Sequence, residues 1–142
     1  MTDERQTPCV ERVIEDFKAS VSEDASVLEE SLTPRLRHVE FVPANPNAAR
    51  ASVIIGKADE AIVEVIVTLG TESRFELGAT EKDCRLLRDL LEAAREGRLE
   101  ETRDRLGTKC VVYLADGREM RTRTAHLPVL KIRRRTFEPY SG

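Results

Sequence analysis

The chain of 142 residues lacks tryptophan, and only 4% of its residues are aromatic. The sequence therefore shows no surface on which nucleic-acid bases would stack. Its seven glycines stand too far apart for a GxGxxG or GxxxxGK phosphate-binding loop. No apolar run is long enough to cross a membrane, and the polar N-terminus does not resemble a signal peptide. We therefore expect a cytoplasmic protein with no membrane span.

Metal-binding and disulfide patterns are also missing. The three cysteines, Cys9, Cys84 and Cys110, are far apart, and the two histidines, His38 and His126, stand alone. No CxxC, HxxxH or HExxH spacing is present. An odd number of separated cysteines argues against a disulfide framework, so we expect them to be small buried side chains. The sequence predicts no metal and no cofactor.

The strongest strand signal is the segment 62–69, which is β-branched at almost every position. Its alternation predicts a core face made of Val63, Val65, Val67 and Leu69. Further strands are predicted at 35–43, 51–55, 74–78, 108–114, 118–125 and 129–137. The pair Asp116-Gly117 is typical of a hairpin turn between the strands on either side of it.

Two amphipathic helices are predicted. The first begins at Thr7-Pro8, with Thr7 as N-cap and Pro8 at the first helical position. The second begins at Thr80, which forms a capping box with Asp83, and ends before Gly97. The segments 26–32 and 99–106 are predicted as shorter helical turns.

These elements predict one α+β domain over residues 1–142. We expect an antiparallel sheet of about six strands in two meanders, with the N-terminal and central helices packed on one face. Residues 1–6 and 138–142 are expected to be flexible.

Charge is distributed unevenly along the chain. The net charge is −3, but residues 1–107 carry 15 basic and 23 acidic residues, and residues 108–142 carry eight basic and three acidic residues. The basic residues of the C-terminal part are predicted to project from one face of a hairpin. They are Arg121 and Arg123 on one strand and Lys131, Arg133 and Arg135 on the next.

Two interpretations of this basic hairpin remain open. Glu64 and Glu76, on the non-core side of their strands, would neutralise it within the fold. Alternatively, the hairpin binds an acidic partner, either nucleic acid or a protein surface.

Three functions follow from these observations. We favour a non-catalytic protein-binding or assembly module that pairs with another protein or with itself as a homodimer. Bacterial immunity proteins are similar in size, and the element order is loosely similar to that of dimeric secretion chaperones, although no motif matches either family. The alternative is a nucleic-acid-binding protein that uses the basic hairpin. A small enzyme assembled around Cys84, His38 and His126 is the third hypothesis.

Overall fold

The computed structural model describes residues 3–59, 61–125 and 132–141. It contains two helices and two antiparallel sheets, which confirms the predicted α+β class. The strands are divided between a five-stranded and a four-stranded sheet, rather than forming one sheet of about six. In chain order the elements are α1 (Asp3–Val21), β1 (Ala25–Thr33), β2 (Leu36–Pro43), β3 (Ala51–Ala58), β4 (Ala61–Leu69), β5 (Ser73–Leu77), α2 (Glu81–Glu96), β6 (Leu99–Arg103), β7 (Gly107–Tyr113), β8 (Glu119–Ala125) and β9 (Arg133–Thr136).

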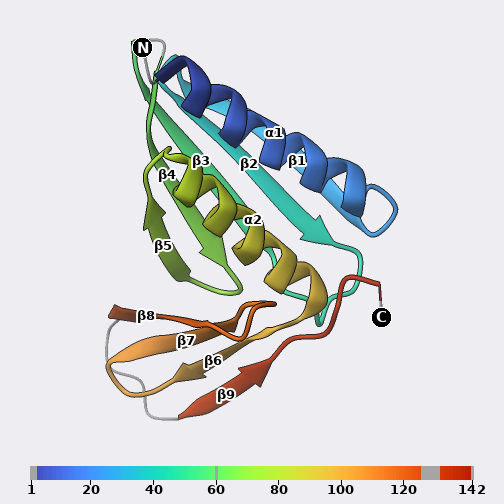
Figure 1. The fold of residues 1–142 in the computed structure, drawn as a ribbon. Coiled ribbons are helices and arrows are strands. Elements are labelled where there is room, and N and C mark those ends of the chain that lie inside the picture. The colour runs from blue at the N-terminus through green and yellow to red at the C-terminus, as the bar shows by residue number, and fades with distance from the viewer. Residues whose placement is uncertain (1–2, 60, 126–131, 142) are drawn as a thin grey trace.

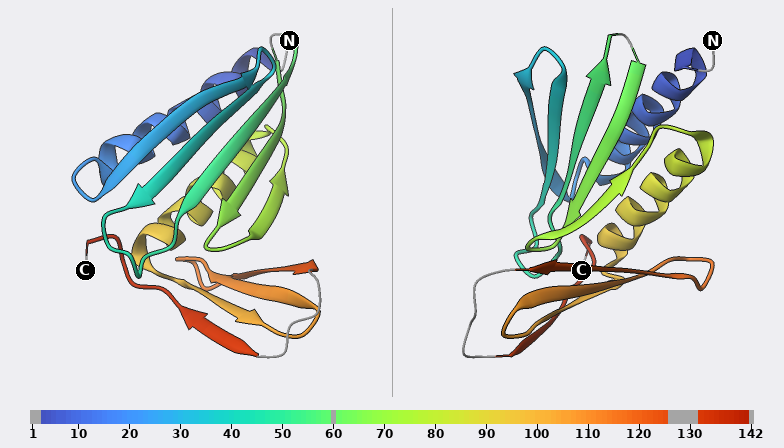
Figure 2. Two further views of the ribbon diagram at one scale, coloured as in Figure 1. Left: turned by 180° about the vertical axis from the view of Figure 1, so that it is seen from behind. Right: turned by 90° about the vertical axis from the view of Figure 1, so that its left-hand side faces the viewer.

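The five-stranded sheet is a meander in which every strand pairs with its neighbour in the chain. Both helices pack on the same face of this sheet, as the sequence predicts (Figures 1 and 2). Alternate residues on that face are buried and apolar, and each fully buried Val, Ile, Leu or Phe contributes about 1.5–3 kcal/mol. Among them are Val39, Phe41, Val53, Ile55, Val65, Val67 and Leu69.

A β-bulge interrupts the alternation in β4. The register shifts between Gly56 and Lys57, and Lys57 pairs with Ile62, so Val63 has no partner residue on β3. The extra residue reverses the direction of the side chains beyond it. Ile62 is therefore 3% exposed and Val63 is 57% exposed. For this reason the prediction that Val63 belongs to the core face with Val65 is wrong.

The segment 26–32 lies in strand β1 and not in helical turns. Its Leu28 and Leu32 have helical spacing, but both side chains are exposed, at 57% and 49%. Residues 26–31 pair with β2 in an unbroken register, which shifts only between Ser31 and Thr33, and this pairing satisfies backbone groups of the segment. Pairing with β2 therefore makes this segment a strand, although the spacing of its leucines favours a helix.

Helix α1 begins at Asp3, before the predicted start at Thr7. Its apolar side chains Val10, Ile14, Phe17 and Val21 are buried against the sheet and α2, and none is more than 4% exposed. Phe17 also meets the Phe41 ring edge-on, with ring centroids 4.8 Å apart.

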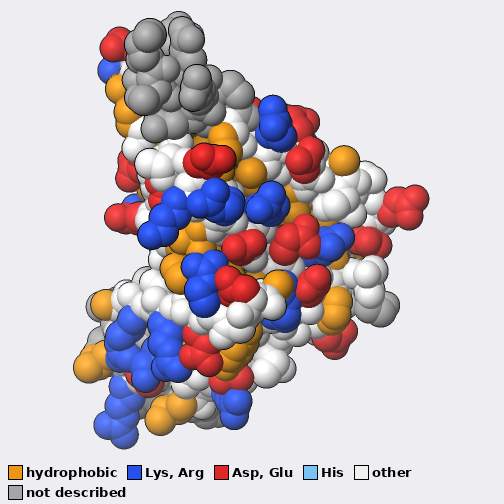
Figure 3. Space-filling model, viewed as in Figure 1, with side chains coloured by type: hydrophobic (Ala, Val, Ile, Leu, Met, Phe, Trp, Pro, Cys, Tyr) orange, Lys and Arg blue, Asp and Glu red, His pale blue; other side chains and the backbone are white. Residues whose placement is uncertain are grey.

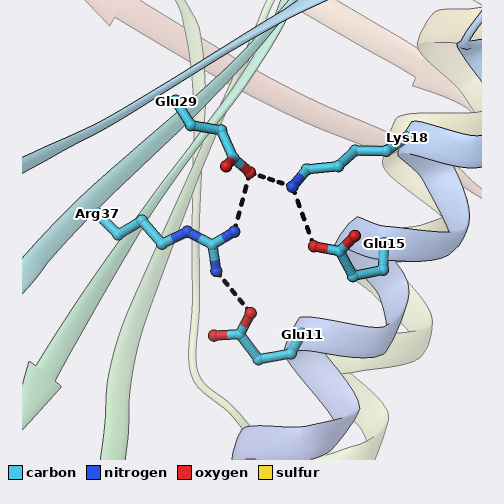
Figure 4. Close-up of polar contacts among 5 residues, drawn as sticks. All are labelled: Glu11, Glu15, Lys18, Glu29 and Arg37. Carbon is cyan, nitrogen blue, oxygen red and sulfur yellow. Dashed lines mark hydrogen bonds and ion pairs between the residues drawn. The ribbon is translucent and has the colours of Figure 1, made fainter.

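A chain of ion pairs joins α1 to β1 and β2 (Figure 4). Glu29 of β1 binds both Lys18 of α1 and Arg37 of β2, the latter at 2.9 Å. Lys18 also pairs with Glu15 at 3.0 Å, and Arg37 with Glu11 at 2.5 Å. The network holds the first helix to the edge of the sheet.

Helix α2 has the predicted ends. The Thr80 side chain accepts a hydrogen bond from the Asp83 backbone N–H, and the Asp83 carboxylate accepts one from the backbone N–H of Thr80. Gly97 ends the helix in the left-handed conformation, at φ 74°. Its apolar stripe of Leu87, Leu90, Leu91 and Ala94 is fully buried.

The second sheet has the strand order β8-β7-β6-β9 and lies beyond one end of the first (Figure 1). The segment 99–103, predicted as part of a helix, is strand β6, because it pairs with β7 on one side and β9 on the other. The two sheets meet where β8 lies beside β5. There the Thr122 and Thr124 hydroxyls donate to the backbone oxygens of Arg74 and Glu72, at 3.0 and 3.1 Å.

Phe137 and Tyr140, which follow β9, are packed against the body of the protein, in contrast to the flexibility expected for the segment 138–142. Tyr140 is 3% exposed, and its hydroxyl donates to the Ala49 carbonyl oxygen at 2.7 Å. Its backbone N–H donates to the Arg95 carbonyl oxygen, and the Glu138 N–H donates to that of Asn47. The aromatic side chain at position 140 is what anchors this segment.

Candidate functional site

The predicted basic residues do not form one hairpin. Arg121 and Arg123 lie on β8, and Arg133 and Arg135 lie on β9, at opposite edges of the four-stranded sheet. Strand β9 pairs with β6 instead of β8. Lys131 lies outside the described residues.

The two pairs of arginines also face opposite sides of the sheet. Arg135 is directly opposite Glu101, which is opposite Cys110, which in turn is opposite Thr122. Residues directly opposite one another share a face, so Arg135 shares a face with Thr122. The arginines on either side of Thr122 therefore point away from it. The face of Thr122 is turned toward the five-stranded sheet, because its hydroxyl binds a backbone oxygen of β5.

The outward-facing arginines have acidic neighbours. Arg121 pairs with Glu119 at 2.7 Å, and Arg123 pairs with Asp104 at 3.0 Å. The four side chains are between 34% and 69% exposed, so these pairs contribute little to stability. In the space-filling view, Lys and Arg side chains gather over the four-stranded sheet (Figure 3).

Glu64 and Glu76 do not neutralise these arginines. Both glutamates belong to the five-stranded sheet, where Glu64 lies opposite Gly56 and Glu76 pairs with Arg74 at 3.3 Å. The prediction that Glu64 and Glu76 neutralise the basic residues is therefore wrong.

The inward-facing arginines line a cavity of about 230 Å³ between the two sheets, which we call the arginine pocket. Arg103 of β6 and Arg133 of β9 are directly opposite each other, and Arg135 is two residues further along β9. Within the described part of the chain, no acidic side chain forms an ion pair with any of the three. The pocket is lined by Thr71, Glu72, Glu101, Arg103, Thr108, Arg133 and Arg135.

A buried carboxylate forms part of the wall of the arginine pocket. Glu101 is 3% exposed. It accepts a hydrogen bond of 2.6 Å from the Ser73 hydroxyl and longer bonds of 3.2 Å from the Thr71 backbone N–H. The tight turn at Gly70, with φ 67°, brings these donors to it. Nearby, the Thr108 hydroxyl donates to Glu72 at 2.6 Å.

A second depression, of about 250 Å³, adjoins the arginine pocket and shares Thr71 and Arg135 with it. The Arg135 guanidinium lies 4.6 Å from the centroid of the Phe137 ring, so the ring holds it by a cation–π contact. Arg50, on the other side of this depression, is 65% exposed. The two depressions together form a basic groove where the sheets meet.

The sequence did not identify Arg103 or Glu101 as members of this site, because both lie in the segment predicted as a helix. On a strand, Glu101 and Arg103 are two residues apart and so share a face. The pocket residues contributed by β9 were identified by their charge alone.

The residues considered for catalysis are not brought together. Cys84 is buried in α2, where burial and then a hydrogen bond with Cys9 raise the pKa of its thiol to about 12. His38 is opposite Ile54 on the far face of the five-stranded sheet, 3.5 Å from Glu30. The sheet separates Cys84 from His38, and His126 lies outside the described residues. A thiol with so high a pKa is a poor nucleophile at neutral pH.

The described ranges contain no group of three or more His, Cys, Asp or Glu side chains arranged to hold a metal ion. In the part of the chain that the structure describes, neither helix is both long and apolar enough to cross a membrane.

Comparison of the chain with protein-family models, with curated proteins and with solved structures finds no match in any of the three.

Proposed function

We propose that this protein is a non-catalytic protein-binding module that holds an acidic segment of a partner protein in the arginine pocket. The observation that supports this proposal is the unneutralised pair Arg103 and Arg133. Like charges directly opposite each other on neighbouring strands destabilise a sheet. Neither arginine has an acidic ion-pair partner among the described residues. A bound carboxylate would remove the repulsion.

Arginine suits this role because its planar guanidinium donates two parallel hydrogen bonds to a carboxylate. In the pocket the guanidinium groups extend from two paired strands, and Arg135 is further restrained by the Phe137 ring. Such restraint lowers the entropy lost on binding. The shape of the site thus favours one or two acidic side chains over a diffuse negative surface.

A protein segment suits the site better than nucleic acid does. The protein as a whole carries a net charge of −3, and the pocket wall includes Glu72 and Glu101. A polyanion that crossed the pocket would meet these carboxylates and also the acidic side chains of the five-stranded sheet. A short acidic segment brings fewer negative charges near them.

The proposal is tested by reversing the charge of two arginines on each face of the four-stranded sheet in turn. Fluorescence anisotropy measures the affinity for labelled acidic peptides, for scrambled neutral peptides and for single-stranded DNA. The variant R133E/R135E is expected to bind acidic peptide at least about tenfold more weakly than the native protein. The control R121E/R123E changes the same residue types on the outward face and is expected to bind as the native protein does.

Two results would contradict the proposal. Equal losses in both variants would mean that general charge, and not the pocket, controls binding. Preferential binding to DNA, with log affinity falling linearly with log salt concentration, would favour the nucleic-acid alternative.

Self-association is a separate part of the proposal. Neither helix covers the outer face of the five-stranded sheet (Figure 2), on which Ile54 and Ile66 are directly opposite each other. A homodimer through this face is expected to appear as twice the monomer mass in light scattering, and to be lost in I54K/I66K. A native protein of monomer mass would remove this part of the proposal.

The cytoplasmic location also remains a prediction.

A further inference from the structure

Charges of both signs line the arginine pocket without meeting one another. Arg103, Arg133 and Arg135 lie in the same small cavity as Glu72 and Glu101. Across the described residues, no nitrogen of these arginines comes within 4.0 Å of an oxygen of these glutamates. The basic and the acidic walls are therefore separated by a space that a ligand can fill.

The acidic wall retains the capacity to bind a donor. Glu101 accepts hydrogen bonds from a backbone N–H and the Ser73 hydroxyl, and Glu72 accepts one from the Thr108 hydroxyl. All these donors are neutral. A carboxylate has about four lone-pair positions, so each glutamate can accept a further hydrogen bond. A ligand that is only anionic would meet the arginines but would place its charge beside these carboxylates.

We propose that the arginine pocket recognises an N-terminal acidic residue, with the side-chain carboxylate against the arginines and the α-ammonium group against Glu72 and Glu101. This inference rests on the proposed function, because it specifies which part of the acidic partner enters the pocket. One residue with both charges neutralises both walls. Hydrogen bonds between charged groups are also the stronger kind.

The decisive measurement uses the native protein and two peptides. Both have the sequence Glu-Glu-Ala-Ala-Ser, and one of them carries an N-terminal acetyl group that removes the ammonium charge. At pH 6.5, titration calorimetry is expected to show about tenfold tighter binding of the free peptide. Raising the pH to 9 takes the α-amino group through its pKa of about 8, so the preference for the free peptide is expected to disappear.

The charged protein groups that face the ligand are Glu72 from the β4–β5 turn, Glu101 and Arg103 from β6, and Arg133 and Arg135 from β9. Cys110, opposite Glu101, has a thiol pKa that burial raises to about 11. The acetylated peptide has no α-amino group, so any change in its affinity between pH 6.5 and pH 9 measures the effect of pH on the protein itself.

Charge-removing variants identify the wall that binds the ammonium group. E72Q and E101Q are each expected to reduce the preference for the free peptide, whereas E76Q, on the other sheet, leaves it unchanged. Equal affinity for both peptides at pH 6.5 would overturn this inference and leave the proposed function standing. Binding of neither peptide would overturn both. Because the pH comparison uses only the native protein, a variant that fails to fold does not affect the result.

Discussion

Gly70 determines where the Glu101 carboxylate can lie. A Cβ atom at position 70 would be 2.9 Å from the carboxyl carbon of Glu101, and the backbone there has φ +67°. Both facts require glycine: the conformation is unfavourable for other residues, and the space is occupied by a buried charge. The turn and the pocket wall therefore depend on the same residue.

The variant G70A is expected to be less stable than G117A, although both glycines have positive φ. At Gly117 an added Cβ meets nothing within 4 Å, so only backbone strain of about 1–2 kcal/mol is expected. At Gly70 the added methyl also displaces Glu101 from Thr71 and Ser73, which is expected to cost about 1–3 kcal/mol more. Urea denaturation measures both; equal losses would show that Glu101 relocates freely.

The pocket residues show how far local sequence can predict a site. The charge of Arg133 and Arg135 marked them as candidate binding residues. Their orientation depends on which strand β9 joins and in what register, and a shift of one residue reverses every side chain. That choice is made by pairing with β6, far away in the chain, so no local pattern near Arg135 reveals it. Arg121 and Arg123 carry the same charge and face the other way.

At the scale of elements, the ion pairs around Glu29 connect three segments that the sequence does not obviously relate. The hydrogen bond from Lys18, and then that from Arg37, hold the pKa of Glu29 below its usual value of 4.5. A carboxyl group with a lower pKa in the folded chain stabilises the fold above its unfolded pKa. This stabilisation is lost as the pH falls through the folded pKa.

Replacement of Glu29 by Gln is therefore expected to destabilise the protein at pH 7, and the loss is expected to shrink as the pH falls through the folded pKa of Glu29. The Glu29 side chain is 39% exposed, so solvent screening limits the loss to under about 1 kcal/mol, and added salt reduces it further. Chemical denaturation of the native protein and E29Q over a series of pH values below 7 measures the difference. The control E30Q, on the opposite face of β1, is expected to change stability less. A difference that does not shrink as the pH is lowered would contradict the electrostatic explanation.

Elements were predictable where their signals are local. The capping box of Thr80 and the terminal Gly97 are sufficient to locate α2, because caps act within a few residues. By contrast, β1 has Leu28 and Leu32 at helical spacing, and three of the five residues of β6 are charged. They become strands because neighbouring strands satisfy their backbone groups. Such pairing is invisible in a short window of sequence.

At the scale of the whole molecule, the residues after β9 connect parts that are far apart in the chain. Tyr140 binds the β2–β3 connection through Ala49 and the end of α2 through the Arg95 carbonyl oxygen. Burial raises the pKa of the Tyr140 hydroxyl, so it remains a donor at any working pH. The C-terminal segment therefore joins both sheets to the second helix.

Removal of this hydroxyl in Y140F is expected to lower the free energy of unfolding by about 1–2 kcal/mol, because the buried Ala49 carbonyl loses its donor. The matched control is Y113F, since Tyr113 is 40% exposed and its hydroxyl binds no described residue. Thermal and urea denaturation measure the two variants. Equal stabilities would mean that water replaces the lost donor.

The separation of β9 from its partner strand also bears on the order of folding. Every pair in the five-stranded sheet closes a short stretch of chain, whereas Glu101 must find Arg135 across β7, β8 and their connections. Longer loops close at a greater entropic cost and more slowly. A chain leaving the ribosome can thus complete the first sheet early, while the arginine pocket forms only after β9 has been synthesised. The five-stranded sheet is therefore in place before the pocket beside it exists.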